Sequence, residues 1–312
     1  MRRTSVFVIF VLVFQLLVVG NPNSHAGAFA AQNSCSLTPQ VTVVIDGEFN
    51  DLLVTRAICR GVKAVDEILG EYGSTLPRVT VWLFADRARA VRKLATFTSW
   101  RWPSGAFAVA TGSNVILSPS RNMMQLQAQL DRILVAYTAH ELTHTLQNLN
   151  SGEARWLLEG AAQYVGMLVR EKREGIPATV TEEGRSGLLH HYQDGLHPSK
   201  LESERQFLAS SIGGYVVSMY SFDLLVSETE DGMDAYLNCY LPESKRANWR
   251  TAFEKCFDVS VAEFYELFDE YAAIEFAEFP SERRARELEK RHAYWRKLIE
   301  CAPGPTAMFC IA

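Results

Sequence analysis

The stretch "AYTAHELTHTLQ" carries two histidines, His140 and His144, at the spacing of one helical face. Residues four apart on a helix are neighbours, so both imidazoles can point at one ion. Zinc binds imidazole nitrogen at about 2.0–2.1 Å, which one helical turn can provide. Glu141 is rotated off this face, so it is better placed to hold an attacking water and take its proton. The motif predicts a catalytic metal site with Glu141 as general base.

A third ligand is needed, because a catalytic zinc site takes three protein ligands and leaves the fourth position to water. Glu159 in "RWLLEGAAQY" lies fifteen residues after His144, behind a glycine-containing loop and at the start of a predicted helix. An antiparallel return of that helix would bring Glu159 over the two histidines. Alone, a glutamate there is explained by the helix dipole, worth about 0.3–1 kcal/mol. Beside the histidine pair, we expect Glu159 to be a ligand.

The two segments together resemble those of the gluzincin zinc metallopeptidases, most closely the bacterial peptidase MA-like group. The resemblance covers about residues 40–275. It implies one Zn²⁺ held by His140, His144 and Glu159, with Glu141 as base. It also implies a thermolysin-like α+β fold, in which an N-terminal mixed lobe with a small sheet meets a mostly helical C-terminal lobe at the zinc site. An edge strand of the sheet would lie along the substrate cleft.

Two departures from the family pattern are visible. Many relatives carry a carboxylate four residues after the glutamate ligand, where this chain has Gln163. An amide accepts a hydrogen bond but carries no charge, which would lower the basicity of a ligand histidine. The segment "SGAFAVATG" also lacks the G-x-M-E-N motif with which aminopeptidase relatives hold a free N-terminus. The resemblance therefore implies an endopeptidase acting on peptides or proteins.

A further donor is needed for the oxyanion of the reaction, and such sites usually take it from a Tyr or His of the helical lobe. Tyr215 and Tyr220 are the candidates, with Tyr215 ahead because it better matches the tyrosine of the family helix. Either tyrosine is equally explained as a core aromatic. His190 and His191 are a third option, in what we expect to be a surface loop.

The first 31 residues have the pattern of a secretory signal. Arg2 and Arg3 precede an apolar run over residues 6–19, and small residues follow. The alternative is an uncleaved anchor, although the run is short for a bilayer span. We therefore expect a secreted or periplasmic protein without a stable membrane span after cleavage. Cleavage would remove two arginines and no acidic residue, shifting the net charge from −5 to −7. That acidic balance argues against a nucleic-acid partner.

Six cysteines lie beyond this signal, and an even count in an exported chain favours disulfides. Buried free thiols are the alternative. No pair has the C-x-x-C spacing of a cysteine zinc site. We expect local pairing, as Cys35–Cys59, Cys239–Cys256 and Cys301–Cys310.

The remaining pattern divides the chain into a signal (1–31), an α/β lobe with the histidine helix (32–150), a helical lobe with the glutamate ligand (151–280), and a charged helix with a cysteine-containing tail (281–312). The α/β lobe is predicted to hold strands over 41–46 and 78–86, a helix over 51–72, and two short strands around the turn at 112–114. We expect the helical segment from Arg121 to break before Val135. The glycines between Gly184 and Ser199 predict a surface loop.

These features together predict an exported zinc-dependent endopeptidase. One alternative is a secreted binding or scaffold protein that keeps the metal for stability. Another is a zinc hydrolase acting on a non-peptide amide or ester, which would use the same metal chemistry. A purely structural site has no need of Glu141, so its presence favours catalysis.

Overall fold

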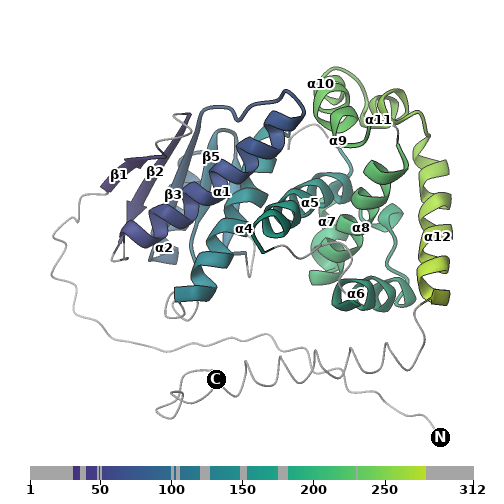
Figure 1. Cartoon of the computed structure of the whole chain (residues 1–312), viewed down its shortest axis with the longest axis horizontal. Coiled ribbons are helices and arrows are strands. Elements are labelled where there is room, and N and C mark those ends of the chain that lie inside the picture. The colour runs from purple at the N-terminus through teal and green to yellow at the C-terminus, as the bar shows by residue number, and fades with distance from the viewer. Residues whose placement is uncertain are drawn as a thin grey trace, which may run out of the picture.

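The computed structural model describes residues 31–35, 40–47, 49, 51–99, 102, 106–119, 127–147, 153–174, 182–229 and 231–278. The secretory-signal run, the charged segment after residue 280 and the expected Cys301–Cys310 pair lie outside these residues. The fold is α+β, with a small sheet and mostly helical remainder. Figure 1 shows the sheet on one side of the molecule, α6 to α12 on the other, and α4 and α5 between them.

The strands are β1 (Ala31–Ser34), β2 (Val41–Asp46), β3 (Val79–Phe84), β4 (Ala108–Thr111) and β5 (Asn114–Leu117). The helices are α1 (Asp51–Glu71), α2 (Arg87–Ala95), α4 (Gln127–Leu146), α5 (Arg155–Glu174), α6 (Glu182–Gln193), α7 (Glu204–Ala209), α8 (Ile212–Glu228), α9 (Gly232–Asp234), α10 (Leu241–Ser244), α11 (Trp249–Phe257) and α12 (Val261–Glu278). A 3₁₀ turn, η1 (Pro198–Lys200), and a π-helical stretch, η2 (Ala235–Tyr240), complete the described elements.

The sheet has the order β1-β2-β3-β5-β4, with β2, β3 and β5 parallel and both outer strands antiparallel to their neighbours. Its central strands are rich in β-branched residues, which suit a pleated and buried surface. Val43, Val81 and Val115 face one another in register across these strands and are fully buried. The predicted hairpin is confirmed, with β4 at one edge of the described sheet. That edge strand packs against α4, so the sheet supports the histidine helix.

Two of the expected disulfides are confirmed. Cys35 after β1 is bonded to Cys59 on α1, and Cys239 in η2 is bonded to Cys256 on α11. The first bond joins the edge strand to the helix that packs on both the sheet and α4. The second closes the turn between the π-helical stretch and α11. The first bond fixes elements on the sheet side of the α4–α5 pair, and the second fixes elements on the opposite, helical side.

The described part of this segment has no break before Val135, because α4 continues without interruption from Gln127 to Leu146; residues 121–126 lie outside the described residues. Its sequence contains no Gly or Pro that would end a helix. Leu134 and Val135 are buried, so the turn at the expected break is held by packing.

The expected surface loop from Gly184 to Ser199 is wrong. Most of it forms α6, followed after a short turn by η1. Leu188 and Leu189 are completely buried, and α6 packs against α8. Glycine inside a helix costs only about 0.5–1 kcal/mol relative to alanine, which burial of two leucines outweighs.

No helix in the described part of the chain is long and apolar enough to cross a membrane.

Helices α5 and α8 make a very close approach at Gly160, next to the predicted glutamate ligand. A Cβ added to Gly160 would lie 2.3 Å from the carbonyl oxygen of Ser218, a distance that requires one of the helices to move. Only glycine therefore allows this packing. The contact sets the position of the first turns of α5, which carry Glu159, relative to α8.

We predict that Gly160→Ala lowers the free energy of unfolding by about 1–3 kcal/mol, the usual cost of forcing extra atoms into a packed interior. Urea unfolding followed by circular dichroism would measure it. Gly70→Ala is the matched control, because Gly70 is an exposed helical glycine with nothing within 4 Å of the added Cβ. This control should raise stability by about 0.5–1 kcal/mol. Equal effects of the two substitutions would contradict the close approach.

Candidate metal centre

The structure brings His140, His144 and Glu159 together in the interior between α4 and α5. The Nε2 atoms of the two histidines are 3.1 Å apart. Glu159 Oε2 lies 3.3 Å from Nε2 of His140 and 3.5 Å from Nε2 of His144. All three side chains are buried, and Glu159 is only 2% exposed. The antiparallel return of α5 thus places the glutamate over the histidine pair, as the sequence predicts.

These three separations fit a tetrahedral metal ion. Ligand bonds of about 2.0–2.1 Å to a tetrahedral zinc ion require ligand atoms about 3.3–3.4 Å apart. The observed separations of 3.1, 3.3 and 3.5 Å cluster around that value. Glu159 Oε2 is also fully buried and accepts no hydrogen bond from the described residues. A buried carboxylate oxygen is costly without a partner, so the donor set fits a bound cation.

Arg155 holds the other oxygen of the glutamate. Its Nη2 atom lies 2.7 Å from Glu159 Oε1, one helical turn away. Burial alone would raise the pKa of Glu159, but the charges of His144 and Arg155 outweigh it and hold that pKa well below its usual value. The carboxylate is therefore ionised, with Oε2 left to face the histidines. The sequence analysis missed Arg155, although an i,i+4 Arg–Glu pair is a recognisable signal.

Gln147 fixes the orientation of His144. The side-chain nitrogen of Gln147 donates to the carbonyl of Leu158 at 2.9 Å and to the hydroxyl of Tyr236 at 2.7 Å. Its Oε1 atom must then accept, so His144 Nδ1 donates to it at 2.6 Å. Nδ1 therefore carries a hydrogen, and in the neutral form of the ring Nε2 presents a lone pair to the ligand cluster. Such partners orient a ligand and raise its basicity.

Gln163, which the family resemblance places at the carboxylate position, does not have this role. It lies one turn after Glu159 and lines a small pocket together with His140. No described hydrogen bond joins its amide to either ligand histidine. The ring that receives support is His144, from Gln147 directly after the end of α4, rather than His140 from α5.

Glu141 is buried next to the cluster but is not part of it. Its exposed fraction is 6%, and it points off the ligand face of α4. Burial raises its pKa, while the neighbouring histidines oppose that shift. A carboxylate whose pKa lies above its usual value is a better base. The charge of Glu141 also contributes to raising the pKa of Tyr137, one turn earlier on α4, after the larger effect of burial.

Tyr215 lies at the centre, whereas Tyr220 lies in the core. The ring of Tyr215 is centred 6.3 Å from that of His140 and 4.8 Å from that of Phe207. Burial, then the charges of Glu159 and Glu141, raise the pKa of Tyr215, so its phenol stays a hydrogen-bond donor. Tyr220 is five residues further along α8, about 140° around the helix, and is 1% exposed. Of the two predicted tyrosines, the structure brings only Tyr215 to the histidines.

His190 and His191 lie near the end of α6, on a helix rather than in the expected loop. His190 is exposed, and its Nε2 atom lies 3.7 Å from Oδ2 of Asp194. His191 lies against Gly213 on α8, where its Nδ1 atom would be 2.8 Å from an added Cβ. These two histidines and Asp194 have ligand-type atoms within 4.8 Å of one another, but the cluster is largely exposed. Neither histidine belongs to the buried cluster of Glu159.

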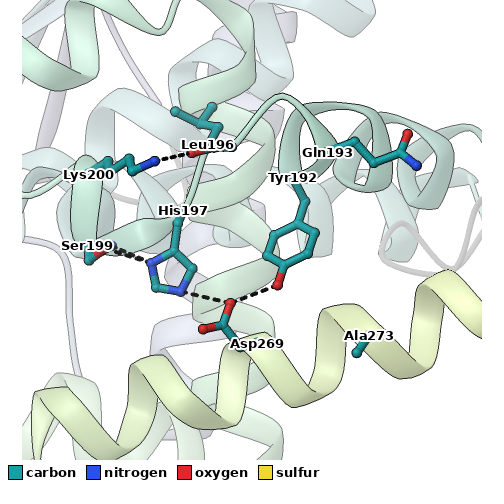
Figure 2. A pocket seen from close by; sticks show the side chains of 9 residues that line it. Tyr192, Gln193, Leu196, His197, Ser199, Lys200, Asp269 and Ala273 are labelled. Atoms are coloured by element: carbon teal, nitrogen blue, oxygen red, sulfur yellow. Dashed lines mark hydrogen bonds and ion pairs between the residues drawn. The ribbon is translucent and has the colours of Figure 1, made fainter.

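A larger pocket, of about 700 Å³, lies beside α12 and is not lined by the metal cluster. Figure 2 shows His197 and Tyr192 both directed at Asp269 of α12. His197 Nδ1 accepts a hydrogen bond from the backbone N–H of Ser199 at 3.1 Å and so caps η1. Tyr192 donates to Asp269 at 2.8 Å. These contacts connect α6 and η1 to α12, which accounts for the positions of the two side chains.

No protein-family model matches the chain, and no curated protein sequence matches it significantly. The assignment of a metal centre therefore rests on the residues and their geometry.

We predict that Gln147→Leu weakens Zn²⁺ binding by about 10–100-fold, because removal of the partner that orients a ligand histidine has effects of this size. Competition with a chromogenic chelator would measure the affinity, with thermal unfolding of the metal-free protein as a check on folding. Gln163→Leu is the matched control and should change the affinity by less than about threefold. A larger effect of Gln163→Leu would instead favour the arrangement implied by the family pattern.

Proposed function

We propose that this protein is an exported zinc-dependent endopeptidase with a thermolysin-like, gluzincin architecture. One observation carries the proposal. Three potential ligand atoms lie at the separations that a tetrahedral metal ion requires, and the buried carboxylate of Glu141 lies beside them without being a ligand. Closed structural zinc sites use four protein ligands, whereas catalytic sites use three. The described cluster offers three: His140, His144 and Glu159. An imidazole pair and one carboxylate suit zinc.

The residues of this site have distinct roles in peptide hydrolysis. A bound zinc ion supplies Lewis acidity, which polarises a carbonyl and lowers the pKa of water. Glu141 accepts a proton from the water that attacks the carbonyl carbon. It then transfers this proton to the amine nitrogen as the C–N bond breaks. Tyr215 donates a hydrogen bond to the oxyanion that forms on the carbonyl oxygen. Arg155 and Gln147 hold the ligands in place.

The sheet edge supports a peptide as substrate. Phe107, directly before β4, contacts Tyr137 on the histidine helix with ring centroids 5.8 Å apart. The edge strand β4 is therefore close to the α4 turn that precedes the ligands. An extended peptide can bind an exposed strand edge through backbone hydrogen bonds. This favours a peptide over a small amide or ester, which has no use for a strand edge.

A scaffold protein stabilised by metal is less well supported. Glu141 coordinates nothing in this arrangement, yet it is buried, and burial of a carboxylate costs free energy. A site selected for stability alone would gain from an apolar residue there. The two disulfides support export, because such bonds persist in oxidising compartments.

We predict that Glu141→Gln lowers peptide hydrolysis by about 10²–10⁴-fold, the contribution of a general base, with Zn²⁺ still bound. The purified zinc-loaded protein would be incubated with a diverse peptide library and the products read by mass spectrometry. A chelator-treated sample and metal analysis of the variant are the controls. If Glu141→Gln cleaves as fast as the wild type, Glu141 is not the base.

We predict that Tyr215→Phe lowers kcat by about 10²–10³-fold, the cost of losing one oxyanion donor, without loss of bound zinc. Single-peptide kinetics would measure kcat and KM separately. Tyr220→Phe removes a hydroxyl from the same helix and should leave kcat within about twofold, because Tyr220 lies in the core. Unchanged turnover in Tyr215→Phe would remove this residue from the mechanism.

A further inference from the structure

Gln147 is buried directly after the end of α4, and its side-chain amide is held by three contacts. Its Nε2 atom donates to the carbonyl oxygen of Leu158 at 2.9 Å and to the hydroxyl oxygen of Tyr236 at 2.7 Å. Both hydrogens of the amide nitrogen therefore have acceptors, and Oε1 is the atom left to face Nδ1 of His144. A buried N–H group without an acceptor is costly, so each acceptor helps to keep the amide in this orientation.

The hydroxyl of Tyr236 is one of these two acceptors, and it lies in the protein interior. The whole side chain is buried, and it comes from η2, 89 residues after Gln147. Burial, followed by the charge of Glu153, raises the pKa of Tyr236, so the phenol keeps its hydrogen. The tyrosine thus presents a neutral acceptor to the amide nitrogen, at a position that the packing of η2 determines.

Glu153 lies two residues before the start of α5 and holds the tyrosines of η2. Ser244, at the end of α10, donates through its hydroxyl to Oε1 of Glu153 at 2.8 Å, and the hydroxyl of Tyr240 lies 3.4 Å from Oε2. The rings of Tyr240 and Tyr236 stack on each other, with centroids 5.7 Å apart and planes inclined by 15°. The carboxylate therefore contacts one tyrosine directly, and the ring stack passes this restraint on to Tyr236.

We propose that Tyr236 is a positioning residue of the metal centre, and that Glu153 holds it in place. Neither residue is one of the three potential ligands. Both act through Gln147, whose amide oxygen orients His144. Without the hydroxyl of Tyr236, the amide of Gln147 can rotate in the metal-free protein, and metal binding must then restore its orientation. The proposal rests on the zinc site of the proposed peptidase and extends the machinery of that site to η2.

The first test is Tyr236→Phe, which removes the hydroxyl and keeps the stacked ring. We expect Zn²⁺ binding to weaken by about tenfold, the lower end of the effects seen when a ligand histidine loses its partner. Competition of the purified protein with a chromogenic chelator would measure the affinity, and thermal unfolding without metal would check folding. Tyr192→Phe is the matched control, because it removes a tyrosine hydroxyl that donates to Asp269 outside the metal centre. It should change the affinity by less than about twofold.

A double-mutant cycle separates positioning through Gln147 from a general loss of stability. The double variant Gln147→Leu/Tyr236→Phe should bind Zn²⁺ within about twofold of Gln147→Leu alone, because the group on which Tyr236 acts is already missing. Glu153→Gln should weaken binding by about three- to tenfold, and it too should add nothing to Gln147→Leu. The visible absorption bands of the Co²⁺-loaded protein report the geometry of the ligands. They should shift in Tyr236→Phe and stay unchanged in Tyr192→Phe.

The outcomes separate this proposal from the proposed function, because the readouts are affinities and spectra and not turnover. Wild-type affinity in Tyr236→Phe, an unshifted Co²⁺ spectrum, or additive losses in the cycle would overturn the positioning role. Wild-type affinity in Glu153→Gln would overturn the role of that carboxylate. If these effects appear but the zinc-loaded wild type cleaves no peptide, the positioning role stands and the peptidase function falls. Absence of Zn²⁺ binding by the wild type would overturn both.

Discussion

The structure depends on one electrostatic constraint, the burial of an ionised glutamate oxygen against the Nε2 atoms of two histidines. Arg155 neutralises only one side of the Glu159 carboxylate, and the other side faces His140 and His144 at 3.3 and 3.5 Å. Gln147 directs the lone pair of His144 Nε2 to the same point. Three potential ligand atoms converge there. A cation satisfies all of them, which is why these residues are better explained as ligands than as core polar groups.

The helices around this point are held in position by features outside the motif. Gly160 lets α5 approach α8 closely, and the edge of the sheet packs on α4. Tyr236 reaches Gln147 from the π-helical stretch, 89 residues away in the chain. Stretches of π-helix are rare in proteins, and many of those that do occur are found at functional sites. Residues far apart in the chain therefore contribute to the orientation of a single histidine, so that the geometry of this site and the folding of the chain are coupled.

The pattern of the chain was sufficient for much of the fold. The strands β2 and β3, the helix α1 and the hairpin of β4 and β5 follow from residue type and periodicity. The two described disulfides join cysteines only 24 and 17 residues apart, so local pairing was a sound expectation. The unbroken turn at Val135 and the helix α6 have a common cause. Helix continuation at both places depends on burial against distant residues, which outweighs length and glycine content.

The sequence by itself determined the candidate ligand pair, because the H-E-x-x-H spacing fixes two imidazoles on one helical face through local geometry alone. It also offered Glu159, since a short connection makes an antiparallel return the simplest path. Only the tertiary structure decided between Tyr215 and Tyr220, and only it revealed Gln147 as the partner of His144. Those choices depend on which face of α8 meets α4 and on a contact from η2. Such contacts join residues far apart in the chain, and no local pattern encodes them.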